Sequence, residues 1–315
     1  MDTKSFLGLN VLDISEAEFV CGISIPKSTD IVQISSPSIE LVTQAREKNF
    51  LFKPFRLLWI MEIPVTTDEY FAQLSSKQRK NIKRSIRSFQ SASLTLRFEE
   101  HLNSQSYRVW LELYRKVIGG MNIGNVVATE SFFDKKKDSL VGIFLQDSQN
   151  NLCGGTIAQL HSDDMFVCKF GVIHPNYRHL DLTRYLDFEA MQLARRLGCS
   201  IFSLGTDTNL YGYHLSVGLY LYKKTFGVHP VPRQVIDPNS IDVLQKITNF
   251  KKFSEQCFIL SYGGDDKFVG NLFCKKIPDK TTLEMYTAPF LEKLRIIQVE
   301  SDESSMFELE ETIEA

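Results

Sequence analysis

Short apolar runs separated by polar turns mark the middle of this chain, and a segment with helical periodicity follows them. The three runs cover residues 141–145, 152–160 and 165–173. Because only short polar connections join these runs, they predict an antiparallel meander of strands. In the next segment, residues 182–197, leucines and an alanine fall on one face of a predicted helix that Gly198 ends.

The same pattern assigns elements to the rest of the 315 residues. Further strands are predicted at residues 19–25, 31–34, 55–63, 94–98, 201–204, 219–226, 258–262 and 268–274. Helices are predicted at residues 38–48, 75–89, 104–118, 129–138 and 282–294, with a short helix opened by Thr66. Residues 300–315 include seven acidic side chains and no basic one, which is typical of a flexible tail.

Composition adds few constraints. The chain is 43% hydrophobic and 23% charged, with a formal net charge of −2, as in an ordinary globular protein. No apolar run approaches the roughly 20 residues of a membrane span, and the first residues lack the layout of a secretion signal. The six cysteines are scattered without a CxxC pair, which disfavours a metal site. We therefore expect a cytoplasmic protein that has no membrane span and holds no metal.

One predicted helix, at residues 75–89, carries basic side chains and no acidic one. Its six cations are Lys77, Arg79, Lys80, Lys83, Arg84 and Arg87. On a helix they lie within roughly 160° of arc, whereas Ile82, Ile86 and Phe89 share the remaining side. Since the whole chain is nearly neutral, this positive face is a local feature. Such a face either binds an anion or is simply a solvated helix surface, and both interpretations stay open.

Several segments in order resemble motifs of a known group. Residues 74–87 read LSSKQRKNIKRSIR, which resembles the LS-x-K-x-R-x-x-I-R-R opening of the FemAB-like, or BioF2-like, branch of the GNAT acyltransferase superfamily. The later landmarks that it resembles are the CGGT run at 153–156, Tyr177-Arg178, Gly198 and the YKKTFG run at 222–227. This resemblance covers about residues 55–232. It implies an α/β (α+β) fold in which helices flank a mixed, mostly antiparallel sheet, with room for a tandem GNAT-like arrangement.

The resemblance also divides the chain. Residues 1–100 form an expected N-terminal GNAT-like subdomain that includes the basic helix, and residues 101–235 form the expected GNAT-like acyltransferase core. Residues 236–298 are expected as a C-terminal appendage, and residues 299–315 as the acidic flexible tail.

By this resemblance, the chain is expected to be an N-acyl- or aminoacyltransferase. Such enzymes move the acyl group of a thioester or tRNA ester to an amine by direct attack. They need a hydrogen-bond donor that stabilises the oxyanion, a group that accepts the proton of the amine, and a site that binds the anionic donor substrate. No permanently bound cofactor is expected; acyl-CoA, aminoacyl-tRNA or a phosphopantetheinyl carrier is the co-substrate. The expected partners are an amine acceptor, either a small molecule or a peptide, and tRNA or an acyl or peptidyl carrier protein.

A non-catalytic protein that binds nucleic acid or a carrier protein through the basic helix is the alternative. The near-neutral total charge and the lack of interleaved aromatic residues count against nucleic acid.

Three residues are candidates for catalysis. Lys223 occupies the position of the family's lysine, so the resemblance implies that it stabilises developing negative charge; a surface lysine at the end of a strand is the alternative. Asp207 follows a buried strand and either accepts a proton or hydrogen bond from the amine or simply forms a turn. His214 has the intrinsic pKa of a base, although it also fits a structural loop histidine. Lys169 and Tyr177 are further candidates for lining the site.

The turn at residues 178–183 corresponds to the CoA-binding turn of GNAT enzymes, but both of its glycine positions are replaced, by Asp181 and Thr183. Arg178 joins the six helix cations as a candidate for binding the donor's anion. Asp181 is predicted to cap the following helix, where its carboxylate would oppose a pyrophosphate. We therefore expect weak binding of plain CoA.

Overall fold

The computed structural model describes residues 2–121, 126–161, 164–213, 215–264, 266–299 and 306–314, the last range for its backbone only. The chain divides into two compact units. The central unit consists of Leu58–Thr206 and Lys223–His229. The flanking unit consists of Met1–Leu57, Asp207–Tyr222 and Pro230–Ala315.

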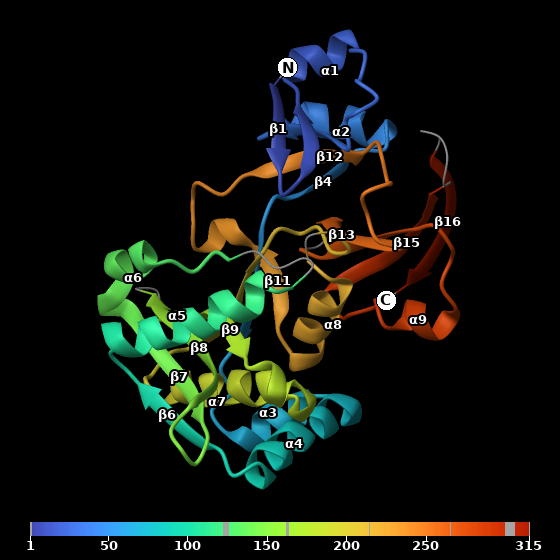
Figure 1. The fold of residues 1–315 in the computed structure, drawn as a ribbon. Helices are drawn as coiled ribbons and strands as arrows, with labels where there is room; N and C mark the ends of the chain where they lie inside the picture. Colours follow the sequence, from blue (N-terminus) through green and yellow to red (C-terminus); the bar gives the residue numbers. More distant parts are fainter. Residues whose placement is uncertain are drawn as a thin grey trace. The chain divides into compact units, whose positions relative to one another are not determined.

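A seven-stranded sheet organises the central unit, with the order β11-β5-β10-β9-β8-β7-β6 (Figure 1). The strands are β5 (Leu57–Glu62), β6 (Thr95–Glu99), β7 (Leu140–Gln146), β8 (Leu152–His161), β9 (Met165–Ile173), β10 (Ile201–Asp207) and β11 (His229–Pro232). Strands β6 to β9 pair antiparallel in sequence order, which confirms the predicted meander. Strand β10 then pairs parallel to β9. The predicted class, a mixed and mostly antiparallel sheet flanked by helices, is confirmed.

Helices cover this sheet. They are α3 (Thr67–Gln73), α4 (Ser76–Ser91), α5 (Ser104–Gly119), α6 (Glu130–Lys136) and α7 (Leu182–Arg196), with short 3-10 turns η1 (Lys137–Ser139) and η2 (Pro175–Leu180). Both α5 and α7 pack on β8 and β9, and α4 packs on α7 (Figure 1). Trp110 anchors α5: its buried indole donates a hydrogen bond to the carbonyl of Gly155 on β8, 3.0 Å away. No helix among the described residues is long and apolar enough to cross a bilayer.

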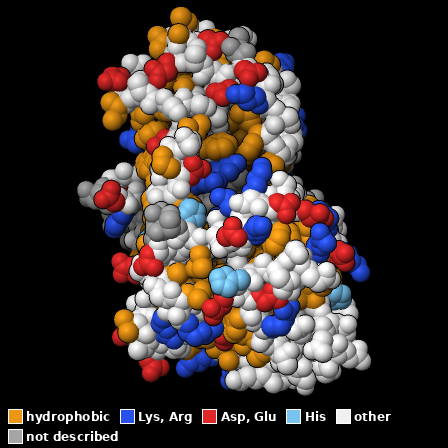
Figure 2. All heavy atoms as spheres, turned by 90° about the vertical axis from the view of Figure 1, so that its left-hand side faces the viewer, with side chains coloured by type: hydrophobic (Ala, Val, Ile, Leu, Met, Phe, Trp, Pro, Cys, Tyr) orange, Lys and Arg blue, Asp and Glu red, His pale blue; other side chains and the backbone are white. Residues whose placement is uncertain are grey.

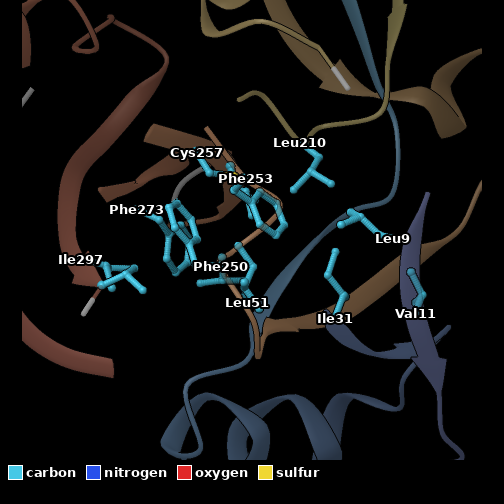
Figure 3. Close-up of a cluster of buried hydrophobic side chains, with 13 residues drawn as sticks. Leu9, Val11, Ile31, Leu51, Leu210, Phe250, Phe253, Cys257, Phe273 and Ile297 are labelled. Atoms are coloured by element: carbon cyan, nitrogen blue, oxygen red, sulfur yellow. The ribbon is translucent and has the colours of Figure 1, made fainter. Parts of the chain in front are cut away.

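Two sheets build the flanking unit, with the orders β1-β2-β3-β12-β4 and β13-β14-β15-β16. The first comprises β1 (Asp2–Phe6), β2 (Leu9–Asp13), β3 (Ile31–Ser35), β4 (Leu51–Pro54) and β12 (Asp242–Ile247). The second comprises β13 (Gln256–Tyr262), β14 (Phe268–Cys274), β15 (Leu291–Val299) and β16 (Met306–Glu314). The helices of the flanking unit are α1 (Glu16–Cys21), α2 (Ile39–Glu47) and α9 (Lys280–Glu284), with the 3-10 turn η3 (Arg233–Val235). Both sheets contribute side chains to one buried apolar cluster, including Ile31, Leu51, Phe253 and Phe273 (Figure 3).

The division of the chain differs from the expected domains. Strand β12 lies between β3 and β4, so residues 236–298 complete the unit that the first 57 residues begin, and are not an appendage. The expected boundary at residue 100 falls inside the central unit. Part of the expected flexible tail forms β16, which pairs antiparallel to β15. All three differences arise from strands that pair with segments distant in the chain. A local sequence pattern carries no information about such pairing.

Three predicted elements are wrong. Residues 219–226 are the helix α8 (Val217–Phe226), because its buried side chains Tyr220, Lys223 and Phe226 recur every third residue. A short apolar run fits a strand equally well, and only burial distinguishes the two. Residues 19–25 were predicted as a strand, but α1 lies there instead, where a capping box of Ser15 and Glu18 starts it. The helix predicted at 282–294 is confined to α9, and β15 follows.

Candidate active site

Strands β9 and β10 part in the middle of the central sheet. They run in parallel register over three residue pairs only, of which Val167 with Ser203 is the last. Strand β9 continues to Ile173 and β10 to Asp207, and within these two fully described strands no further pair joins them. Where two parallel strands separate, an extended ligand can insert and use backbone groups for recognition. We call this place the strand opening.

A β-bulge lies at the start of the strand opening. The register of β9 with β8 passes from Phe170 opposite Ile157 to Cys168 opposite Ala158, so Lys169 is the extra residue. A bulge bends its strand and redirects nearby side chains, and bulges are common beside active sites. The sequence analysis named Lys169 as a lining residue, and the structure locates it at this bulge.

The side chain of Lys223 is buried within the central unit. Only 5% of the residue is exposed, and its ammonium lies 5.9 Å from the centre of the Trp59 ring on β5. The alternative interpretation of a surface lysine is therefore wrong. Burial raises the pKa of the Cys168 thiol, the charge of Asp187 on α7 raises it further, and the charge of Lys223 lowers it. Lys223, Asp187 and Cys168 thus form one buried polar cluster at the strand opening.

The sequence analysis missed two members of this neighbourhood, Trp59 and Asp187. Asp187 did leave a signal, because it shares a helical stripe with Met191 and Ala194, both of which are buried. A carboxylate in such a stripe is an uncommon choice unless it has a polar partner. For Trp59 there was no signal beyond a strongly apolar strand.

The structure describes one of the other two catalytic candidates. Asp207 belongs to the flanking unit, where its buried carboxylate accepts a hydrogen bond from the Tyr211 hydroxyl at 2.8 Å. His214 lies outside the described residues. Tyr177 is half-buried near Cys153, and the hydrogen bond with this thiol raises the pKa of Tyr177 to about 12.

The turn before α7 differs from its prediction. Asp181 stands at the N-terminus of α7 in a left-handed conformation (φ 55°), and its side chain makes no capping hydrogen bond. Its carboxylate instead lies 3.2 Å from Nη2 of Arg84 and 3.6 Å from Nε of Arg184. The Ser85 hydroxyl also donates to the Asp181 carbonyl at 2.7 Å. The predicted cap is therefore wrong, and Asp181 instead joins the turn to α4.

Helix α4 presents the predicted basic face. A capping box of Ser75 and Gln78 starts the helix, and Ile82 and Ser85 are its buried side chains. Five of the six cations are exposed: Lys77, Lys80, Lys83, Arg84 and Arg87. Arg178, the seventh predicted anion-binding residue, is also exposed on η2. The face of the protein shown in Figure 2 carries both basic and acidic side chains.

An open surface pocket of about 580 Å³ lies along this face. Its lining residues come from α3 and α4: Phe71, Ser76, Arg79, Lys80, Lys83, Ile86 and Arg87. Arg79 is half-buried, and its guanidinium donates to the Phe71 carbonyl and the Ser76 hydroxyl. The pocket thus combines two apolar side chains with cations that point to solvent.

The basic face disfavours folding. Six pairs of its cations stand three or four positions apart, and each such like-charged pair destabilises a helix by about 0.2–0.5 kcal/mol. The charge of Lys77 also acts on neighbouring Lys224, whose pKa falls to about 8, mainly through burial. Since this arrangement weakens the helix, binding explains it better than stability does.

Comparison with known proteins decides the type of domain. Residues 76–224 match the family model of the acetyltransferase (GNAT) domain. The chain carries a GNAT acetyltransferase domain. The predicted resemblance to the GNAT superfamily is confirmed by this match, as is the prediction of an acyltransferase.

The GNAT domain spans both features described above. It begins at the first residue of α4 and ends at Lys224 in α8, so it contains the basic face, Asp181, the strand opening and Lys223. Residues outside it, including most of the flanking unit, are not explained by this match.

No curated protein matches the chain significantly. Solved structures similar to it include L-PGS from Bacillus licheniformis, at 12% identity and a TM-score of 0.45, covering 68% of this chain and 67% of that one. FemX is similar at 9% identity and a TM-score of 0.43, covering 76% and 81%. The C-terminal domain of a putative lysylphosphatidylglycerol synthetase from Agrobacterium fabrum is similar at 10% identity and a TM-score of 0.43, covering 69% and 67%.

Gly205 lets β10 approach β9 closely at the start of the strand opening, just past the last strand pair. Its φ is +76°, and a Cβ there would lie 2.6 Å from the Cys168 carbonyl oxygen. We expect Gly205→Ala to destabilise the protein by more than the roughly 1–2 kcal/mol of a left-handed alanine, because strand β9 must also move. Urea denaturation measures this loss. Gly198→Ala is the matched control, since its φ is +81° but nothing lies within 4 Å of the added Cβ. Equal losses for the two variants would contradict a close approach of the strands.

Proposed function

We propose that this GNAT domain transfers an acyl or aminoacyl group from a thioester or tRNA ester to an amine, with the reacting carbonyl at the strand opening. One observation carries the proposal: strands β9 and β10 part beside the buried ammonium of Lys223, whose charge acts on Cys168 at the first position past the last strand pair. Transfer chemistry needs positive charge or N–H donors where an oxyanion develops, in a place shielded from water.

The proposed reaction has two steps. The nitrogen lone pair of the neutral amine attacks the acyl carbon, and the carbonyl electrons move onto oxygen. Lys223 is proposed to stabilise this oxyanion. When the carbonyl re-forms, the bond to the thiolate or the tRNA hydroxyl breaks, and the amine nitrogen loses a proton to a base or water. Asp207 and His214, the candidate bases that the sequence named, are proposed for this proton transfer.

The donor is proposed to be other than free CoA. The motif at residues 74–87 resembles the FemAB-like branch, and the CoA-type turn before α7 keeps neither glycine. In addition, two guanidiniums at that turn, Arg84 and Arg184, already contact the Asp181 carboxylate. These two cations are therefore less available to bind a pyrophosphate at the turn.

A transfer assay tests this function. Purified protein is incubated with acetyl-CoA, an acetylated carrier protein or an aminoacyl-tRNA, and glycinamide or a Gly-Lys peptide serves as the amine. Mass spectrometry should detect an amide product that depends on the protein, with faster transfer from a macromolecular donor than from acetyl-CoA. If no donor yields an amide, whereas polyanions bind to α4, the non-catalytic alternative replaces this proposal.

A further inference from the structure

We propose that the basic face of α4, with the pocket between Phe71 and Ile86, docks an acidic carrier protein that delivers the acyl group as a thioester. The inference rests on the proposed function and specifies its donor.

Charge is the first argument. Arg84 contacts Asp181, and Arg79 donates to neighbouring groups of its own unit. No ion pair to a carboxylate is recorded, within the described residues, for the remaining four cations: Lys77, Lys80, Lys83 and Arg87. All four are exposed. An acidic surface would relieve their mutual repulsion and speed association through long-range attraction.

Shape is the second argument. Helix α4 has 16 residues, which corresponds to about 24 Å of helix. The pocket of about 580 Å³ along this helix is lined by the half-buried apolar side chains of Phe71 and Ile86 as well as by cations. An amphipathic helix fits such a surface, because its apolar side chains can enter the pocket while its acidic side chains meet the lysines and arginines. A single small anion would use only part of this length.

The aromatic rings argue against RNA as the occupant. Phe71 stacks on Phe188 with ring centres 5.9 Å apart. The ammonium of Lys83 lies 5.2 Å from the centre of the Phe71 ring. Phe89 stacks on Tyr185 with ring centres 4.1 Å apart. Both rings of α3 and α4 near this surface are therefore engaged within the protein, whereas single-stranded RNA is held by bases stacking on exposed rings. An acidic protein needs no such rings.

The same helix is joined to the donor turn. Arg84 and Ser85 contact Asp181, so a partner docked on the outer face of α4 binds an element fixed to the N-terminus of α7. The docking surface and the strand opening also belong to one compact unit.

Binding of an acidic acyl carrier protein in its holo form tests the inference. We expect a dissociation constant in the micromolar range at 50 mM NaCl, and at least a tenfold loss of affinity in the triple variant Lys80→Glu/Lys83→Glu/Arg87→Glu. The matched control is Lys135→Glu/Lys136→Glu/Lys137→Glu, which changes the net charge by the same amount at exposed positions of α6 and η1. This control should keep its affinity to within about twofold. The urea midpoint of the α4 variant should not fall, because four of the six like-charged pairs become oppositely charged and only two, 80/83 and 83/87, stay alike.

Three outcomes overturn the docking proposal: no binding by the unaltered protein, equal losses in the two triple variants, or tighter binding of tRNA than of carrier protein to the same face. The proposed function fails separately. If acyl transfer from acetyl-CoA proceeds but no carrier protein binds, the function stands and the docking surface does not. If carrier protein binds through α4 but no amide forms from any donor, the docking surface stands and the transferase activity does not.

Discussion

Replacing Lys223 with methionine is expected to lower kcat by about 10²–10³-fold, the range seen when one donor to an oxyanion is removed. KM for the donor should change much less, because the proposed interaction forms only when negative charge develops on the acyl oxygen. Methionine keeps the aliphatic stem that packs near Trp59, so the expected loss is of charge and not of packing.

Steady-state kinetics on the labelled donor measure this effect, and two controls separate it from damage to the fold. Urea denaturation of Lys223→Met measures any loss of stability apart from the loss of kcat, because removing a buried charge can leave its polar neighbours without compensation. Lys224→Met changes the adjacent lysine, which is also largely buried. Similar losses of kcat in both variants would point to disruption of α8. Full activity in Lys223→Met would exclude this residue from catalysis.

Replacing Lys53 with methionine is expected to remove a pH dependence of stability from the flanking unit. Lys53 lies on β4 and is 1% exposed, and its ammonium donates to the Asn209 carbonyl at 3.1 Å. Burial lowers the pKa of Lys53 from its usual 10.5 to about 7. The charge of Cys257 would act on Lys53, but burial raises the pKa of the Cys257 thiol well above the usual range, so the thiol stays protonated.

The sign follows from counting protons. Between pH 7 and 10.5 the unfolded chain keeps the proton on Lys53 and the folded chain has lost it, so the free energy of unfolding rises with pH. The slope from this group approaches about 1.4 kcal/mol per pH unit. Below pH 7 both states hold the proton, and the contribution is constant at its least favourable value.

Urea denaturation of the unaltered protein and of Lys53→Met at pH 6, 7, 8 and 9 measures this contribution. At pH 6 and 7 the variant should be the more stable protein, because it no longer buries a charge. The difference should narrow by about 2–3 kcal/mol by pH 9, as the lysine in the unaltered protein becomes neutral on folding. Parallel stability curves would show that Lys53 does not titrate in this range.

Much of the central unit was predictable because its signals are local. The meander of β7, β8 and β9 follows from three apolar runs with short turns between them, and α7 follows from its leucine stripe. Helix α4 was predicted with its face of cations and its start at Ser75. In each case neighbouring residues carry the whole pattern, so periodicity is sufficient.

The candidate site was predictable only in part. The sequence named Lys223 as a candidate, but it placed this residue on a strand. The structure places it on α8, a helix whose buried stripe includes Lys223 itself. Asp181 was correctly located at the start of α7, but the carboxylate pairs with Arg84, which is 97 residues away in the chain. Neither the strand opening nor the bulge at Lys169 has a local sequence signal, because both are relations between strands.

The sequence by itself determined the GNAT-type order of elements and the single-signed face of α4, since both are written in residues close together in the chain. Tertiary structure decided that Lys223 is buried beside Asp187 and Cys168, that Asp181 ties its turn to α4, and that β12 joins the first sheet. These features depend on contacts between residues far apart in sequence. Such contacts form only when the apolar faces pack, and packing alone settles which polar groups are enclosed and which partners they find.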